Sequence, residues 1–309
     1  MTSLVTIIMA TYNRAHLIME TIISIQNQTH TNFECLIIDD GGSDSTETTL
    51  APVLKTDNRF RYLKRPETYL KGLPGSRNFG LDIGKGRYVI FFDDDDIVHP
   101  QNLELSIKVL NLGYFDFCHY RKAVLCHDKM EYIKEDLISS FQINSSDLYN
   151  IIANILPLAS CTVLWKFEAI GNYRFDESLM YAEEWEFYPR LISKGLTGIG
   201  ITNVLYFNRK HPNSNTGHFF EDNLVQRSSK ANAIFLVLKN LQKQNMLSYK
   251  LKKYILNKSY EFKELNLFAL LINELSISIV ERVFWQIYYF TFQYRFAFYR
   301  LKKSLLKLS

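Results

Sequence analysis

The sequence predicts an α/β protein in which helices flank a mixed, mostly parallel sheet, followed by a helical C-terminal extension. Two observations carry this prediction. Over the first third of the chain, short apolar runs rich in β-branched residues alternate with segments whose apolar residues have helical spacing. After Gly217 the chain has no glycine and no strand-like run. With 309 residues, 47% of them hydrophobic, the chain can bury a large core.

Strands and helices alternate regularly in the first part of the chain. The opening apolar run is followed by a segment that places Leu17, Ile18, Ile22 and Ile25 on one face of a helix. Because each strand is followed by a helix, we expect the strands to be parallel. The expected strands are residues 4–9, 33–38, 60–63 and 87–92, and the expected helices are residues 15–28, 45–55 and 75–83.

The pattern changes twice further along the chain. Residues 114–208 mix short strands with helices near residues 147–155 and 183–194, which favours a second half packed on the same sheet over an independent domain. From residue 221 only helical patterns are left. The helices expected there are residues 223–244, 248–271 and 274–306.

The composition excludes several classes of protein. The four cysteines, Cys35, Cys118, Cys126 and Cys161, have no Cys-x-x-Cys spacing, so neither a zinc site nor a disulfide framework is expected and a reducing cytoplasm is the default. The N-terminal segment has no basic start and no cleavage site, so no signal peptide is expected. A net charge of +4 is too weak to indicate nucleic-acid binding.

Polar clusters follow three of the expected strands. They are residues 11–14 (Thr-Tyr-Asn-Arg), Asp39-Asp40, and residues 93–96, which are four consecutive aspartates. Ligands of such sheets bind beyond the carboxyl ends of the strands, so we expect the three clusters to lie on one rim.

The four consecutive aspartates are the strongest candidate site. Adjacent carboxylates repel one another, so a nearby cation favours their ionised form, and carboxylate oxygens suit Mg²⁺ or Mn²⁺. The alternative is a solvated acidic turn before the helix expected near Pro100. The position after a strand favours the metal site. For Asp39-Asp40 an ordinary turn is an equally good interpretation.

Further candidates come from three segments. Arg77 lies in a glycine-bearing segment that is neither a Walker loop nor a dinucleotide fingerprint, and it could pair with phosphate or be an exposed helix cation. Glu183, Glu184 and Glu186 open a helix, where they could supply a general base or only compensate the helix dipole. His211 follows Arg209-Lys210 in a polar loop, where cations could meet a diphosphate or simply face solvent.

Five blocks of the sequence, taken in order, resemble the family 2 glycosyltransferases of the GT-A fold. The resemblance covers about the first 215 residues and extends from the first strand to His211. The blocks are residues 5–14, 37–44, 75–80, 91–96 and 183–186.

The resemblance implies an inverting, metal-dependent transfer of a sugar from a nucleotide diphosphate to an acceptor hydroxyl. It also implies roles for single residues. Ala10, Thr11 and Tyr12 would line the base pocket with Tyr12 stacking on the base, Asp40 would bond the imide edge, and Asp39 would support the turn. Arg14 and Arg77 would belong to the donor site, Asp94 would lie near the ribose, Asp95 would hold Mn²⁺ or Mg²⁺, and Asp93 and His211 are further metal candidates.

The resemblance also implies a general base and a class of donor. Glu184 matches the family's base, although the family usually has Asp there, so Glu183 and Glu186 are possible substitutes. UDP is the favoured nucleotide because the acid at the base edge resembles that of family members that use it. The acceptor would be a glycan or lipid-linked glycan in surface-polysaccharide synthesis.

On this resemblance, residues 1–112 would bind the nucleotide sugar, residues 113–220 would bind the acceptor, and residues 221–309 would be the helical extension. Two alternatives stay open: a catalytically silent sugar-nucleotide-binding or scaffold protein with the same fold, and a nucleotidyltransferase. The intact acids weigh against the first. The absence of a glycine-rich, basic loop after the first strand weighs against the second.

The end of the extension has an unusual composition. Residues 283–309 carry five cations and no acid, so the rest of the chain has a charge near −1 (+4 minus +5). Its uncharged run, residues 283–294, has 12 residues and is too short to span a bilayer. Two readings stay open: an interfacial helix on the cytoplasmic face of a membrane, or a helix packed on its own domain or on a second copy in a homodimer.

Overall fold

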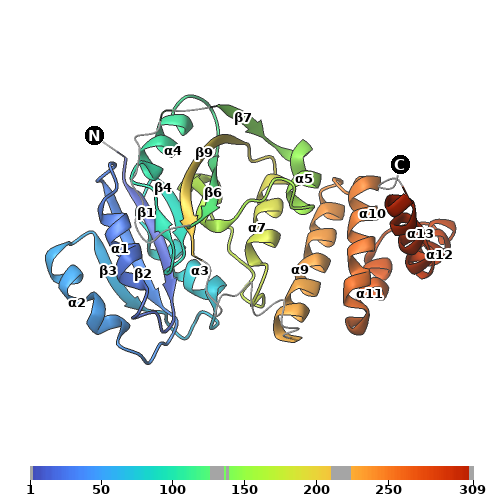
Figure 1. Ribbon diagram of the computed structural model, residues 1–309, viewed down its shortest axis with the longest axis horizontal. Coiled ribbons are helices and arrows are strands. Elements are labelled where there is room, and N and C mark those ends of the chain that lie inside the picture. Colours follow the sequence, from blue (N-terminus) through green and yellow to red (C-terminus); the bar gives the residue numbers. More distant parts are fainter. Residues whose placement is uncertain (1–2, 126–135, 137–138, 210–223, 306–309) are drawn as a thin grey trace. The chain divides into compact units, whose positions relative to one another are not determined.

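The computed structural model describes residues 3–125, 136, 139–209 and 224–305 of the chain. They form two compact units, Met1–Ser229 and Lys230–Ser309. The first unit contains the sheet, and the second consists of helices (Figure 1).

The described part of the first unit holds a sheet of nine strands in the order β3-β2-β1-β4-β8-β6-β9-β5, with β7 also paired to β9. Strands β3, β2, β1 and β4 are parallel, and β6 is parallel to β9. Strand β8 is antiparallel to both neighbours, and so are β5 and β7 to β9. The strands are β1 Val5–Thr11, β2 Phe33–Asp39, β3 Phe60–Lys64, β4 Tyr88–Phe92, β5 Ile97–Val98, β6 Phe117–Val124, β7 Ser140–Ile143, β8 Val163–Lys166 and β9 Gly198–Asn208.

The expected fold class and the first four strands are confirmed (Figure 1). Helices cover both faces of the sheet, which is why β1 and β4 read as continuous apolar runs rather than as alternating ones. The helices of this unit are α1 Ile18–Gln26, α2 Thr46–Thr56, α3 Leu73–Ile83, α4 Asn102–Leu110, α5 Leu148–Ile152, α6 Phe167–Ile170 and α7 Glu183–Ile192.

The side chains of neighbouring residues in β1 point to opposite faces of the sheet. Ile7 points into the core that α1, α2 and α4 cover. Ile8 points to the other face, where α3 lies so close that a Cβ added to Gly80 would be 2.5 Å from the Ile8 Cγ2 atom. Glycine at this position therefore lets α3 pack directly on the sheet. The approach fixes the helix that carries Arg77 at the carboxyl ends of β1 and β4.

The second unit is built from helices. The expectation of two long helices over 248–271 and 274–306 was wrong, because both are interrupted. Asn266 adopts a left-handed conformation that Asn tolerates better than most residues, and Ser278 starts a new helix by accepting a hydrogen bond from the Glu281 N–H. The helices are α9 Leu224–Lys243, which begins in the first unit, α10 Tyr249–Lys258, a 3-10 helix Ser259–Leu265, α11 Leu267–Glu274, α12 Ile279–Phe290 and α13 Phe292–Leu305.

Candidate functional site

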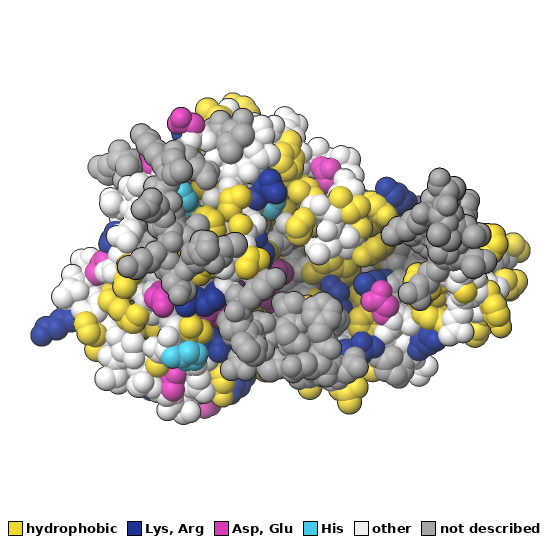
Figure 2. All heavy atoms as spheres, in the orientation of Figure 1, with side chains coloured by type: hydrophobic (Ala, Val, Ile, Leu, Met, Phe, Trp, Pro, Cys, Tyr) yellow, Lys and Arg dark blue, Asp and Glu magenta, His cyan; other side chains and the backbone are white. Residues whose placement is uncertain are grey.

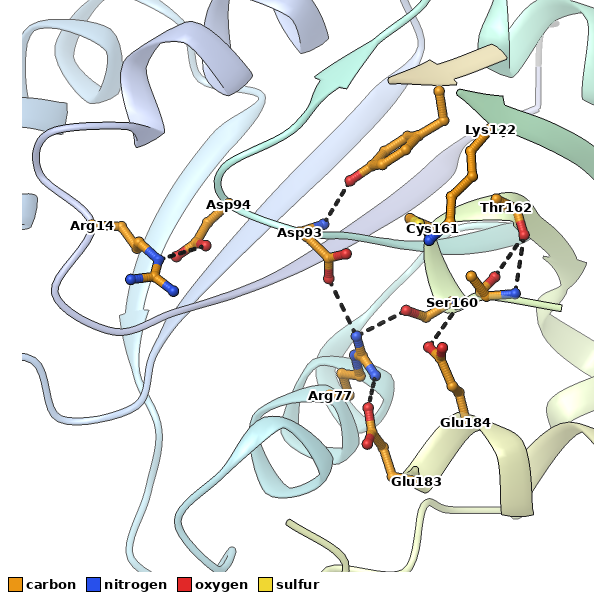
Figure 3. A network of polar contacts seen from close by, with 12 residues as sticks. Arg14, Arg77, Asp93, Asp94, Lys122, Ser160, Cys161, Thr162, Glu183 and Glu184 are labelled. Carbon is orange, nitrogen blue, oxygen red and sulfur yellow. Dashed lines mark hydrogen bonds and ion pairs between the residues drawn. The ribbon is translucent and has the colours of Figure 1, made fainter. Parts of the chain in front are cut away.

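The segments that follow β1 and β4 meet, as the parallel order of these strands requires. The Arg14 Nε atom lies 3.4 Å from Asp94 Oδ1 (Figure 3). It also lies 3.9 Å from Asp95 Oδ2. Strand β1 pairs with β4 up to Met9 opposite Phe92, so both chains leave the sheet side by side. The arginine and the aspartates thus form one rim.

The turn after β2 joins the same rim. The Asn13 Oδ1 atom, beyond β1, accepts hydrogen bonds from the Ser43 and Asp44 N–H groups at 2.7 and 3.2 Å. Asp39 Oδ1 accepts the Gly42 N–H at 2.8 Å, so this carboxylate holds its own turn. Asp40 donates its N–H to the Thr11 carbonyl at 2.9 Å. All three polar clusters therefore gather at one edge of the sheet.

Asp40 has one occupied and one available carboxylate oxygen. Its Oδ1 accepts hydrogen bonds from Arg65 Nε at 2.5 Å, the Gly72 N–H at 3.1 Å and Ser76 Oγ at 3.4 Å. Its Oδ2 receives no donor from the residues that the structure describes. Nearby Tyr12 is 45% exposed, and the Lys71 ammonium lies 4.6 Å from the centre of its ring. The partly exposed ring of Tyr12 therefore lies at the same end of the rim as Asp40, which is itself buried and holds Arg65 and Gly72 through Oδ1.

Arg77 lies at the centre of the site and is buried, so it is not the exposed helix cation considered from the sequence. Its guanidinium donates to Glu183 Oε1 at 2.7 Å and to Ser160 Oγ at 2.9 Å, and lies 3.5 Å from Asp93 Oδ1 (Figure 3). Burial by itself lowers the pKa of Arg77, but the charges of Glu183, Asp93 and Glu184 outweigh it and raise the pKa further. Arg77 is thus a permanent cation held by acids of the site.

The three glutamates that open α7 have different surroundings. Glu183 is buried and paired with Arg77, and burial raises its pKa. Glu186 is buried and bound by Arg190 through two hydrogen bonds of 2.7 and 3.0 Å. Glu184 is only half-buried, and its Oε2 accepts the Ser160 N–H at 2.8 Å. Of the three, Glu184 is therefore the carboxylate best placed to meet a ligand.

The four aspartates after β4 alternate in burial. Asp94 and Asp96 are buried, whereas Asp93 and Asp95 are half-buried. Burial, then the charge of Asp95, raises the pKa of Asp94 to about 7. Burial, then the charges of Asp93 and Asp95, raises the pKa of Asp96 to about 8, although its Oδ1 accepts the Arg209 N–H at 2.8 Å. The run therefore concentrates negative charge that a cation would stabilise.

The residues present fit a divalent cation only in part. In the described part of the chain, no three acidic, histidine or cysteine side chains converge into a ready-made metal cluster. Asp93 and Asp95 could supply two oxygen ligands, which suits a Mg²⁺ or Mn²⁺ ion that takes its other ligands from water and a diphosphate. His211 lies outside the described residues.

Two residues of this region were missed by sequence reasoning. Ser160 bridges the site, because its hydroxyl accepts from Arg77 and its N–H donates to Glu184. The Lys122 ammonium, on β6, lies 3.9 Å from the Cys161 sulfur (Figure 3). That sulfur most strongly, and then the charge of Glu184, raises the pKa of Lys122. No motif or spacing in the sequence distinguishes Ser160. Lys122 likewise has no sequence feature that separates it from other lysines in strands.

The part of the sequence that forms this rim matches a known protein family. Residues 6–153 match the family model described as glycosyl transferase family 2. This segment of the chain belongs to glycosyl transferase family 2. The family 2 match includes β1, the aspartate run and Arg77, whereas Glu183, Glu184 and the second unit lie beyond it.

Relatives of this chain include characterised and uncharacterised proteins. It is 32% identical over 196 residues to an uncharacterised glycosyltransferase of Rickettsia felis, a match that covers 63% of this chain and 31% of that protein. The match thus spans about a third of the length of the relatives in Rickettsia felis and Rickettsia conorii. It is also 27% identical over 230 residues to the UDP-Glc:alpha-D-GlcNAc-diphosphoundecaprenol beta-1,3-glucosyltransferase WfaP of Escherichia coli, covering 73% of this chain and 84% of WfaP.

Solved structures share the family 2 fold. The crystal structure of Staphylococcus aureus TarS with UDP has a TM-score of 0.62 and 20% identity, and the match covers 91% of this chain and 77% of that one. The mannosyltransferase PcManGT of Pyrobaculum calidifontis, in complex with GDP-Man and Mn²⁺, has a TM-score of 0.58 and 16% identity, covering 87% and 73%. At these identities the similarity establishes the GT-A-like fold.

Proposed function

We propose that this protein is an inverting glycosyltransferase that moves a sugar from a nucleotide diphosphate, with UDP favoured, to a hydroxyl of a lipid-linked glycan. One observation carries the proposal. Arg77 pairs with Glu183 and lies next to Asp93, and Ser160 joins Arg77 to Glu184, so the acid candidates of both halves surround one buried cation. The match to glycosyl transferase family 2 and the activity named for WfaP support the same reaction class and acceptor.

The donor would bind along the rim after β1 and β2. The exposed ring of Tyr12 would stack on the base. The Oδ2 of Asp40 would accept the imide N–H of uracil. This arrangement, and the UDP bound to TarS, favour a UDP-sugar.

Glu184 would act as the general base. It would take the proton of the acceptor hydroxyl while that oxygen attacks the anomeric carbon and the bond to the diphosphate breaks, so that the configuration inverts. Arg77 holds Glu183 and Arg190 holds Glu186, which leaves Glu184 for this role. Asp95 and Asp93 would hold a divalent metal. That metal would neutralise the negative charge that develops on the diphosphate. The Mn²⁺ bound to PcManGT is in keeping with this assignment.

Calorimetry tests the donor site first. UDP, GDP and dTDP are titrated with and without Mn²⁺ into the wild type and into Asp95→Asn. We expect Mn²⁺-dependent binding of UDP that is weaker in the variant. A folded protein that binds none of the three nucleotides would overturn the proposal.

Turnover then separates an enzyme from a silent binding protein. We expect release of UDP from a UDP-sugar in the presence of a diphosphoundecaprenol-linked acceptor, and loss of that release in Glu184→Gln with UDP binding retained. Metal-dependent UDP binding without transfer or slow hydrolysis of any UDP-sugar would support the catalytically silent alternative instead.

A further inference from the structure

The helix α12 turns its charged residues toward its own unit. Glu281 Oε1 accepts hydrogen bonds from Lys252 Nζ at 2.6 Å and from Trp285 Nε1 at 3.1 Å. Arg282 Nη1 donates to Asn273 Oδ1 at 2.9 Å. Trp285 is itself almost completely buried. These contacts with α10 and α11 fix the rotation of α12 about its axis, with its charges on the packed side.

The opposite side of α12 is therefore apolar and faces solvent. Val280, Val283, Ile287 and Phe290 recur at spacings of three and four residues, which places them along one face, and all four are exposed. Phe290 is 75% exposed. Figure 2 shows hydrophobic side chains on the surface over the place of α12 in Figure 1. This side of α12, with the exposed Ile279 and Phe284 of the same helix, is here named the α12 face. Helix α13 exposes three further large apolar side chains, Tyr294, Phe296 and Phe298.

This face departs from an ordinary protein surface. Isolated exposed apolar residues are normal, but nine large ones within 20 residues of sequence are typical of an interaction site. A surface helix normally presents its charges to water and its apolar stripe to the core. In α12 the packed side carries Glu281 and Arg282 together with the buried Trp285, and the opposite side is apolar, so something other than water is expected to cover it.

Charge identifies what covers the face. Residues 283–309 contain Arg295, Arg300, Lys302, Lys303 and Lys307 and no acid. A second copy docked symmetrically on the same face would bring two such cationic segments together. Anionic lipid headgroups attract the same cations, while the acyl boundary takes up the apolar side chains.

We propose that the α12 face binds the surface of an anionic membrane, with its apolar residues in the headgroup region and with the cationic composition of residues 283–309 favouring anionic lipid. No helix in the described part of the chain is long and apolar enough to cross a membrane. Binding in the plane of the interface needs no such length. The inference goes beyond the transfer reaction and holds whichever sugar is moved.

Vesicle sedimentation of the full chain tests the proposal. Vesicles of phosphatidylcholine alone are compared with vesicles that also contain phosphatidylglycerol. We expect binding to the second kind, weakened by added salt, and a fall of about tenfold or more in Phe290→Asp, because burial of a Phe side chain contributes that much. Leu112→Asp is the matched control: Leu112 is as exposed and apolar as Ile287 but lies in the first unit, so this variant should bind like the wild type.

Other results would overturn the proposal. If the wild type ignores phosphatidylglycerol vesicles, or if Leu112→Asp weakens binding as much as Phe290→Asp, the face is not a membrane site. If the wild type is a dimer by analytical ultracentrifugation and Phe290→Asp makes it a monomer without changing vesicle binding, a second copy covers the face. Calorimetry with UDP on the same variants keeps the two proposals apart, because loss of membrane binding should leave UDP binding unchanged.

Discussion

Arg77 and Glu183 form an ion pair of 2.7 Å in which both side chains are removed from water. The pair joins α3, from the first part of the chain, to the start of α7. Its partners Asp93 and Ser160 extend it to the aspartate run and, through Ser160, to Glu184. The candidate site is therefore built around a contact between residues 106 positions apart.

Removal of one member of this pair should destabilise the protein strongly. In Arg77→Met, Glu183 keeps its burial but loses its countercharge, so the free energy of unfolding should fall by about 3–5 kcal/mol. Urea denaturation followed by circular dichroism measures this. Arg61→Met is the control, because Arg61 is exposed and 4.0 Å from Glu34, and its loss should cost less than about 1 kcal/mol. Equal losses for both variants would contradict the central role of Arg77.

The glutamates of α7 should separate activity from stability. Glu184→Gln should lower kcat by about 10²–10⁴-fold with little change in the melting temperature, since Glu184 is half-buried and would act as the base. Glu186→Gln should mainly lower stability, because it weakens the two hydrogen bonds with Arg190. Steady-state kinetics and thermal denaturation of both variants decide the matter. A kcat that falls more in Glu186→Gln would move the base to Glu186.

Asp40 should set the preference for the base. An amide in its place keeps one oxygen acceptor but must serve either the Arg65 guanidinium or the imide N–H, so Asp40→Asn should weaken UDP binding about 10–100-fold. Isothermal titration calorimetry with UDP and Mn²⁺ measures the change. Asp44→Asn is a suitable control, because Asp44 is an exposed residue of the neighbouring turn and its carboxylate accepts from Ala15 and Thr46, not from Arg65 or Gly72. If both variants bind UDP like the wild type, Asp40 does not contact the base.

His119 should make stability depend on pH. Burial lowers the pKa of His119 to about 4, below its ordinary value of about 6.5, so the unfolded chain binds a proton that the folded chain refuses. The contribution of His119 to the free energy of unfolding is therefore fully present above about pH 6.5. It is lost as the pH falls toward about 4, and the total loss is about 3 kcal/mol. Urea denaturation between about pH 7.5 and about pH 4.5 measures the slope.

The variant His119→Gln isolates this effect. It retains an amide that can donate to the Thr162 carbonyl, which His119 Nδ1 contacts at 3.2 Å, and it does not titrate. Its stability should fall less steeply over the same pH range. The buried acids change in the opposite sense, because their raised pKa values favour the folded state as the pH falls, but they are present in both proteins and cancel in the difference. Identical slopes would show that His119 does not titrate in this range.

The local pattern of the sequence was enough to predict the sheet-forming half of the fold and the rim. Continuous apolar runs predicted β1, β2 and β4 because a strand covered on both faces needs apolar residues at every position. The order of parallel strands then requires Arg14 and the aspartate run to meet, and they do. Such features follow from periodicity and chain direction, which are properties of neighbouring residues.

The sequence by itself determined the fold class and the acids of the candidate site, whereas the tertiary structure decided the surroundings of each acid. Glu183, Glu184 and Glu186 look alike in sequence, and only their distant partners Arg77, Ser160 and Arg190 give them different surroundings. The same holds for α12, whose exposed apolar side depends on the contacts of Glu281 with Lys252 and of Arg282 with Asn273. Burial and charge pairing are set by residues far apart in the chain, so no local pattern can encode them.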